Sequence, residues 1–304
     1  MSVINNLIDQ SVVYLSPVLL CVLGGIFAYK ANMLNIALEG MMMAGAFVSL
    51  LIANVTGSVP MGYLSAIVVC LLLGLVFSLM GVVLRGNVIV IGLAINMLVP
   101  AVAGFIMKIM SVPSITLPEF STSSIVLHIP FIENIPILGP VLSGHPPITY
   151  ISYIMIPLMS ILMYRTRFGV HVRVVGESED TAISLGLKTN MYKVAAILIG
   201  AGCCALAGIN LALERLSLYT NNMTAGRGFI AIAAIYCGRG KPLASSMYAV
   251  LFSIANALAE YYSLRVSASL LLKVVPYVVM VAVLSIASIL NRHKVHVRGA
   301  FSEQ

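Results

Sequence analysis

The sequence predicts an all-α, polytopic membrane protein with about 8–10 transmembrane helices, one of them broken or re-entrant. Two observations lead to this fold class. Hydrophobic residues fill 60% of the 304 positions and charged residues only 9%, against roughly 25% charged residues in an ordinary soluble domain. Stretches of about 20 residues without any charge also recur along the chain, and each is long enough for a helix to cross the hydrocarbon core.

The charge-free stretches divide the chain into helical segments and short connections. The longest, 40–84, holds two crossings separated by a turn-rich break at 54–60. None has the polar stripe that a helix of a soluble bundle needs, and all are too long and too uniformly apolar for barrel strands. We therefore expect helical spans within 11–29, 40–84, 86–107, 146–164, 194–213, 242–259 and 274–290.

One further apolar segment, 228–238, is too short for a full crossing. Gly-Arg-Gly tripeptides flank it on both sides, at 226–228 and 238–240. Short helices between glycines are tolerated at membrane depth where protein surrounds them or where they line a cavity. The segment is therefore interpreted either as a broken or re-entrant helix or as part of a tilted helix that continues from Met223.

The positions of the basic residues predict the topology. If the basic segment 165–193 is cytoplasmic, alternation of the spans places most of the 17 lysines and arginines on the same side, as the positive-inside rule requires. The N-terminus is then outside and the C-terminus inside, with an external loop at 109–148 and a cytoplasmic tail at 291–304. We expect one transmembrane domain over 1–304, located in the cell membrane, and no removable signal peptide.

Polar residues within or beside the spans are candidates for a substrate pathway, because buried polar groups need hydrogen-bonding partners. Glu39 is the only acid that the sequence places well inside an apolar region. The alternative for Glu39 is a structural role, in which it caps neighbouring backbone or pairs with Lys30; the alternative for the asparagines is that they only tie helices together. The candidate pathway residues are Asn35, Glu39, Asn96, Asn222, Thr224 and Arg227.

Several kinds of chemistry have no signature in the sequence. There is no GxxxxGK[ST] loop for phosphates, no HExxH and no GxSxG, so we expect no intrinsic enzymatic activity. The five cysteines lie in apolar stretches without metal-ligand spacing, so we interpret them as core residues and expect no metal or cofactor in this chain. The net charge of +7 lies mainly between spans, which argues against nucleic acid as a partner.

Within the cytoplasmic segment 165–193, the sequence predicts a short surface helix. Ser178 is suited to cap its N-terminus, Glu179 and Asp180 suit its first turn, and Gly186 suits its end. Ala182, Ile183 and Leu185 would give the helix an apolar face. Such a helix can dock into a partner protein that supplies energy for transport; the alternative is a solvated linker.

Three stretches carry a resemblance to a known family: NIALEGMMMAGAF at 35–47, RTRFG at 165–169 with VGES at 175–178, and NMTAGRGFIAIAA at 222–234. The chain resembles the permease subunits of bacterial ATP-binding-cassette importers of the branched-chain amino acid, ribose and nucleoside group. It is most similar to the shorter permease of nucleoside importers. The likeness covers nearly the whole chain, with several motifs in one order.

The resemblance implies a function and partners. The chain would translocate a nucleoside or simple sugar, together with a second permease subunit, a cytoplasmic ATPase that binds ATP and Mg, and an external substrate-binding lipoprotein. Residues 175–190 would couple the permease to the conformational change of the ATPase. The coupling residues would be Gly176, Glu177, Ala182, Leu185 and Gly186. The alternative is a secondary transporter of a small polar solute, driven by an ion gradient with Glu39 as the ion site.

Overall fold

The computed structural model describes residues 2–117, 126–127, 141, 143–263 and 274–286. Most of the expected external loop 109–148 and all of the expected tail 291–304 lie outside these residues. The long helices of the described part are α1 (Ser2–Lys30), α2 (Leu38–Thr56), α3 (Val59–Ser78), α4 (Val88–Ile109), α6 (Pro147–Arg165), α9 (Thr189–Ile209) and α11 (Pro242–Ser263). Shorter helices are α7 (Arg167–Glu177), α8 (Glu179–Ser184), α10 (Arg227–Cys237) and an apolar helix at Val275–Ile286.

The predicted fold class is confirmed, because the described residues contain seven helices long and apolar enough to cross a membrane. Two shorter apolar helices, α10 and Val275–Ile286, accompany them. The predicted break at 54–60 is also present: α2 ends at Thr56, and α3 begins at Val59 with Pro60 in its first turn. Proline suits this position because the first turn leaves its backbone nitrogens unbonded.

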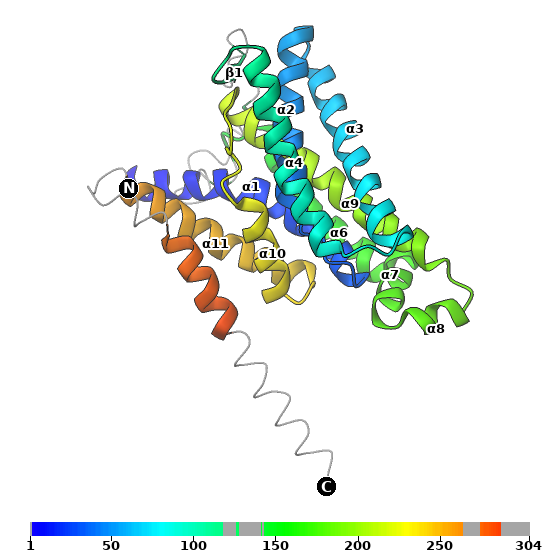
Figure 1. The fold of residues 1–304 in the computed structure, drawn as a ribbon. Helices are drawn as coiled ribbons and strands as arrows, with labels where there is room; N and C mark the ends of the chain where they lie inside the picture. Colours follow the sequence, from blue (N-terminus) through cyan, green and yellow to red (C-terminus); the bar gives the residue numbers. More distant parts are fainter. Residues whose placement is uncertain (1, 118–125, 128–140, 142, 264–273, 287–304) are drawn as a thin grey trace.

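Helices α1 and α2 are the most buried of the long helices, whereas α3, α4 and α6 are the least buried; α3 lies at one side of the bundle in Figure 1. Within the most apolar window of α1, 83% of the residues are buried, against 22% for α4. α1 packs against α9, α11 and α10, and α2 packs against α3, α9 and α4. The exposed apolar side chains of the outer helices suit contact with lipid or with another membrane subunit.

Small residues let α9 approach its neighbours closely, as is common between membrane helices. A Cβ added to Gly24 of α1 would lie 2.5 Å from the Cβ of Cys203, and one added to Gly45 of α2 would lie 3.0 Å from the carbonyl oxygen of Ala205. All five cysteines are free and buried. The interpretation of the cysteines as small core residues agrees with these contacts.

Two π-helical segments extend long helices. η1 (Leu79–Val83) follows α3, and η3 (Asn210–Leu216) follows α9. After η3, strand β2 (Leu218–Tyr219) pairs antiparallel with β1 (Ile115–Thr116), which follows α4. The ends of α4 and η3 are therefore tied together on the side of the bundle opposite α8.

The chain before α10 does not continue as a helix from Met223. Asn222, Ala225 and Gly226 all have positive φ angles, of 62°, 46° and 79°, and α10 begins only at Arg227. At 1.5 Å per residue its 11 residues span about 16 Å, roughly half of the hydrocarbon core. α10 is therefore a short helix that starts inside the bundle, between α2 and α11 (Figure 1).

Candidate substrate pathway and coupling segment

Helix α2 begins within the bundle, where Asn96 of α4 satisfies its first turn. The Oδ1 atom of Asn96 accepts a hydrogen bond from the backbone N–H of Gly40 at 2.7 Å, and its Nδ2 atom donates to the carbonyl oxygen of Ile36 at 2.9 Å. The first N–H groups of a helix have no partner within the helix, so this contact supplies one. Asn96 therefore fixes the start of α2 against α4, and its amide is already occupied by backbone.

Glu39, in the first turn of α2, caps the start of α10. Its Oε1 atom accepts a hydrogen bond from the backbone N–H of Gly226 at 2.8 Å, and its Oε2 atom accepts one from Gly228 at 2.5 Å. Gly228 has no room for a side chain, since a Cβ there would lie 2.5 Å from the backbone nitrogen of Glu39. One carboxylate thus holds the N-termini of α2 and α10 together, where helix dipoles favour negative charge.

This geometry shows which contacts Glu39 makes. Only 8% of the residue is exposed, and neither ion pair found among the described residues joins it to Lys30. It does cap backbone, but the backbone of a segment 187 residues later in the chain rather than a neighbouring one. The two stretches predicted to line the pathway, around Asn35 and around Thr224, are thereby brought to one place.

Asn35 and Thr224 each keep a neutral polar group with unused hydrogen-bonding capacity. Asn35 accepts a hydrogen bond from the backbone N–H of Ala37 at 3.0 Å, but its Nδ2 atom is buried without a partner, as is the Oγ1 atom of Thr224. An unsatisfied buried polar group costs about 1–3 kcal/mol. Groups of this kind are suited to a polar ligand, because the ligand would supply the missing partner.

The remaining two candidates, Arg227 and Asn222, belong to the turn before α10. The guanidinium of Arg227 lies over the ring of Tyr14 at 4.8 Å, and its Nη1 atom donates to the carbonyl oxygen of Met223 at 3.1 Å. Asn222 is exposed and has a positive φ angle. Arg227 therefore fastens the turn to α1 through an aromatic face and a carbonyl group, while its Nε atom is buried without a hydrogen-bond partner.

The expected surface helix within 165–193 is present as α8, at the outer edge of the molecule (Figure 1). The Ser178 hydroxyl accepts a hydrogen bond from the Thr181 N–H at 3.3 Å, and Gly186 takes the left-handed conformation, with φ 77°, just after the helix ends. Ala182 is buried, whereas Ile183 and Leu185 are exposed by 56% and 67%. The helix thus presents apolar side chains outward.

Two contacts fix α8 and α7 to the bundle. Glu179 accepts a hydrogen bond from Lys193 of α9 at 2.6 Å, which holds the pKa of that carboxyl below its ordinary value. Gly176 of α7 packs directly on the carbonyl oxygen of Lys30, at the end of α1, where a Cβ would clash. Glu177, the last residue of α7, is exposed. α8 is therefore connected through α7 to the end of α1, the most buried long helix of the bundle.

The opposite end of the bundle holds a buried polar network that the sequence did not predict. Glu214 of η3 is 1% exposed and accepts hydrogen bonds from the Tyr63 hydroxyl at 2.6 Å and from Asn210 at 2.9 Å. Asn210 also accepts a hydrogen bond from Ser16 of α1 at 3.0 Å. The prediction that Glu39 is the only deeply placed acid is therefore wrong, because η3 carries the helix beyond Leu213 and takes Glu214 into the interior.

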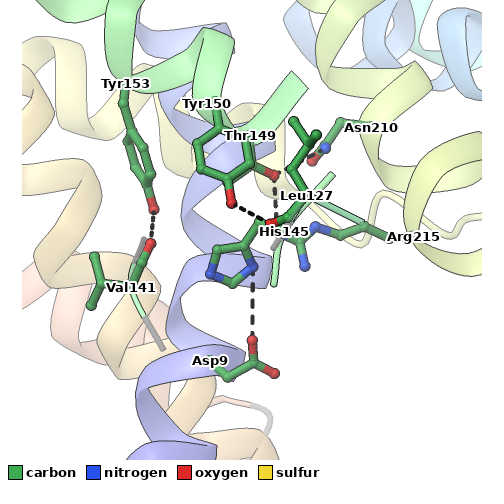
Figure 2. A network of polar contacts seen from close by, with 9 residues as sticks. All are labelled: Asp9, Leu127, Val141, His145, Thr149, Tyr150, Tyr153, Asn210 and Arg215. Carbon is green, nitrogen blue, oxygen red and sulfur yellow. Dashed lines mark hydrogen bonds and ion pairs between the residues drawn. The ribbon is translucent and has the colours of Figure 1, made fainter. Parts of the chain in front are cut away.

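Figure 2 shows the part of this network that reaches α6 and the segment before it. Arg215 donates to the Thr149 hydroxyl at 3.1 Å, and His145, which is 1% exposed, lies 3.8 Å from the carboxylate of Asp9. The Tyr150 hydroxyl donates to the carbonyl oxygen of Leu127 at 3.0 Å. These contacts tie α1, α6 and η3 together at the end opposite α8, so we assign the network a structural role.

The described residues contain no group of three or more His, Cys, Asp or Glu side chains that could hold a metal ion. What they do contain is a multi-pass bundle in which two helices, α2 and α10, begin inside the protein beside unsatisfied polar groups. Helices that begin at membrane depth beside a buried polar site are typical of transport proteins. The fold and the site together define an α-helical membrane permease.

Residues 7–284 match the family described as the permease component of branched-chain amino acid transport systems. The chain belongs to this family and is a transport permease rather than an enzyme.

Individual relatives agree with this family. The chain is 26% identical to the nucleoside ABC transporter permease protein NupC of Lactococcus lactis, with 94% of each chain covered. It is 29% identical to the guanosine ABC transporter permease protein NupQ of Bacillus subtilis, covering 86% of this chain and 84% of the relative. A putative glucose ABC transporter permease protein of Haloferax volcanii, TsgC13, is 28% identical over 85% of this chain and 78% of its own. No solved structure matches the chain significantly.

Proposed function

We propose that this permease translocates a nucleoside, or a related simple sugar, as part of an ATP-driven importer. The single observation that carries the proposal is the junction of α2 and α10, where Asn35 and Thr224 keep unused hydrogen-bonding groups. Both groups are neutral, as are the hydroxyl groups of a ribose. The names of NupC and NupQ, which match most of the chain, support the same substrate class.

The charges near the junction argue for a neutral substrate over an amino acid. An amino acid carries an ammonium and a carboxylate, and each would need a charged or hydrogen-bonded partner at membrane depth. The carboxylate of Glu39 is already engaged by two backbone N–H groups, so it is not free to pair with an ammonium group. The same engagement of Glu39 argues against its use as the ion site of a secondary transporter.

Within this proposal α8 faces the cytoplasm and docks on an ATP-binding-cassette ATPase, which binds ATP and Mg. Exposed Ile183 and Leu185 provide the apolar contact, and Gly176 passes the movement to α1. The N-terminus then lies outside and the C-terminus inside. A second permease subunit covers the exposed apolar helices, an external lipoprotein delivers the substrate, and residues 1–304 form one domain with no cofactor of its own.

Uptake of radiolabelled guanosine tests the substrate assignment. In cells that depend on this chain for uptake, Asn35→Ala and Thr224→Val should each reduce guanosine uptake about tenfold or more, because each removes a group that pairs with the ligand. Asn54→Ala is the control, since Asn54 is exposed near the end of α2. Unchanged guanosine uptake in both variants, or inhibition of uptake by leucine but not by nucleosides, would overturn the assignment.

The coupling assignment has its own test. Leu185→Ser and Glu177→Gln should lower uptake and substrate-stimulated ATP hydrolysis while the protein remains in the membrane. Val55→Ser is a matched control, because Val55 is 70% exposed at the opposite end of the bundle and Leu185 is 67% exposed on the α8 side. Uptake that survives ATP depletion but collapses with an ionophore would instead identify a secondary transporter.

A further inference from the structure

A cavity of about 840 Å³ lies at the α8 end of the molecule; its lining includes Asn32, Met33 and Leu34, directly before Asn35, but not Glu39, Thr224 or Arg227. It is bounded by the end of α1, by α7 and by the turn after α10. Its walls include Lys30, Arg173 and Lys241, with Glu177 as the one acid among the lining residues. A cavity with three cations and one anion favours a negatively charged ligand.

The charge of Glu177 acts on Lys30, but none of the three cations, Lys30, Arg173 and Lys241, forms an ion pair among the described residues. The Nε atom of Arg173 is buried and has no hydrogen-bond partner. Cations that only set the orientation of a membrane protein need contact with water and no other partner. A buried guanidinium nitrogen without an acceptor is different, because it points to a ligand that supplies the acceptor atom.

The backbone holds two of these cations close together. Gly240, in the turn after α10, packs on Tyr29 and on the side chain of Lys30, so that an added Cβ would lie 2.9 Å from the Cε atom of Lys30. Lys241 follows directly. Like charges held side by side repel each other, and an anion between them removes that repulsion.

Aromatic rings complete the walls. The rings of Tyr29 and Tyr236 meet edge to face with centroids 5.1 Å apart, and the guanidinium of Arg173 lies 5.1 Å from the ring of Tyr164. All three tyrosines line the cavity. Lysine and arginine are the usual partners of phosphate oxygens, and arginine can contact two of them at once.

We propose that this cavity binds a phosphate ester at the cytoplasmic face, with Arg173 and Lys241 as its main ligands. The phosphate belongs either to a free nucleotide or to the headgroup of an anionic lipid. The cytoplasmic placement rests on the proposed function, but the binding does not. Because Gly176 and Glu177 also line the cavity, a bound phosphate would lie against the segment that joins α8 to α1.

Melting temperatures of the full chain in lipid nanodiscs test the site, because a ligand that binds the folded state raises them. In the first arm, guanosine 5′-monophosphate is added to phosphatidylcholine discs, and guanosine, which has no phosphate, is the comparison. In the second arm, phosphatidylglycerol replaces part of the phosphatidylcholine. We expect a rise with at least one phosphate ligand. Arg173→Gln and Lys241→Gln should each weaken that binding about tenfold or more, since each removes a charge-assisted hydrogen bond.

Arg239→Gln is the matched control, because Arg239 is an exposed cation two residues from Lys241 that does not line the cavity. A response to the nucleotide alone identifies a free phosphate ester as the ligand, and a response to phosphatidylglycerol alone identifies the lipid. The proposal fails if neither phosphate ligand shifts the melting temperature, or if Arg239→Gln loses the shift as fully as Lys241→Gln does. If the wild-type protein shows no response to either phosphate ligand but still supports guanosine uptake, this site is rejected and the proposed function stands.

Discussion

The Oε2 atom of Glu39 lies 2.5 Å from the backbone nitrogen of Gly228 and accepts its hydrogen bond. This contact joins the first turn of α2 to the first turn of α10, two helices that both begin inside the bundle. The short helix α10 therefore owes its placement to a side chain from the other end of the sequence.

Replacement of Glu39 by glutamine should destabilise this junction. A glutamine side chain offers one acceptor oxygen where the carboxylate offers two, so one of the N–H groups of Gly226 and Gly228 loses its partner. A hydrogen bond to a charged group contributes about 1.5–3 kcal/mol. We expect a lower melting temperature for Glu39→Gln than for wild type. Glu177→Gln is the control, because it changes an exposed carboxylate and should melt close to wild type. Equal melting temperatures of Glu39→Gln and wild type would contradict the capping role.

Gly228→Ala tests the close approach of α10 to α2. The added methyl group would lie 2.5 Å from the backbone nitrogen of Glu39, and overpacking of this kind costs about 1–3 kcal/mol. Gly202→Ala in α9 is the control, because a Cβ at Gly202 meets nothing within 4 Å and alanine favours a helix over glycine by about 1 kcal/mol. The two variants should therefore shift the melting temperature in opposite directions, and the prediction fails if both shift it equally.

The buried network at the end of the bundle opposite α8 predicts that two similar substitutions lower the free energy of unfolding by different amounts. Tyr63→Phe removes the hydroxyl that donates to buried Glu214 at 2.6 Å, and we expect it to cost about 1.5–3 kcal/mol. Tyr150→Phe removes a hydroxyl bonded to the carbonyl oxygen of Leu127 in an exposed position, where the cost should be within about 0.5 kcal/mol. Thermal unfolding of both variants measures the difference, and similar melting temperatures would argue that the Glu214 contact is not formed.

The contact between Glu179 and Lys193 predicts a pH-dependent stability. The hydrogen bond from Lys193 lowers the pKa of Glu179 in the folded protein below its ordinary value of 4.5. The resulting stabilisation is present above that value and is lost as the pH falls through the lowered pKa. Because the Glu179 side chain is exposed to solvent, the pair should contribute only about 0.2–1 kcal/mol.

Glu179→Gln should therefore melt slightly below wild type at pH 7, and the difference should vanish at low pH. Asp180→Gln provides the comparison, since Asp180 shares the first turn of α8 but forms neither of the ion pairs found among the described residues. A difference for Glu179→Gln that persists to low pH would show that the stabilisation does not come from the ionised carboxylate.

Much of the architecture could be predicted from the sequence, because hydrophobic length sets the number and position of membrane helices. The break between α2 and α3 and the cap of α8 by Ser178 also follow from local rules, and the structure has both. These features depend on residues that are neighbours in the chain. Local rules therefore sufficed for them.

The connections between distant segments could not be predicted in the same way. The partners of Glu39 are backbone N–H groups, which leave no side-chain signature in the sequence. Glu214 was missed because the charge-free run ends at Leu213, although the π-helical turn η3 carries the chain on into the interior. A search for acids within one helical turn of the end of an apolar run would have found Glu214.

The separation between Glu39 and its donors has a consequence for biosynthesis. Gly226 follows Glu39 by 187 residues, so at about 5–20 residues per second the ribosome needs roughly ten to forty seconds to supply it. During that interval the nascent chain holds a carboxylate in the membrane region without its final partners. The amino-terminal helices can insert in this period, but the junction of α2 and α10 is assembled only when the last third of the polypeptide arrives.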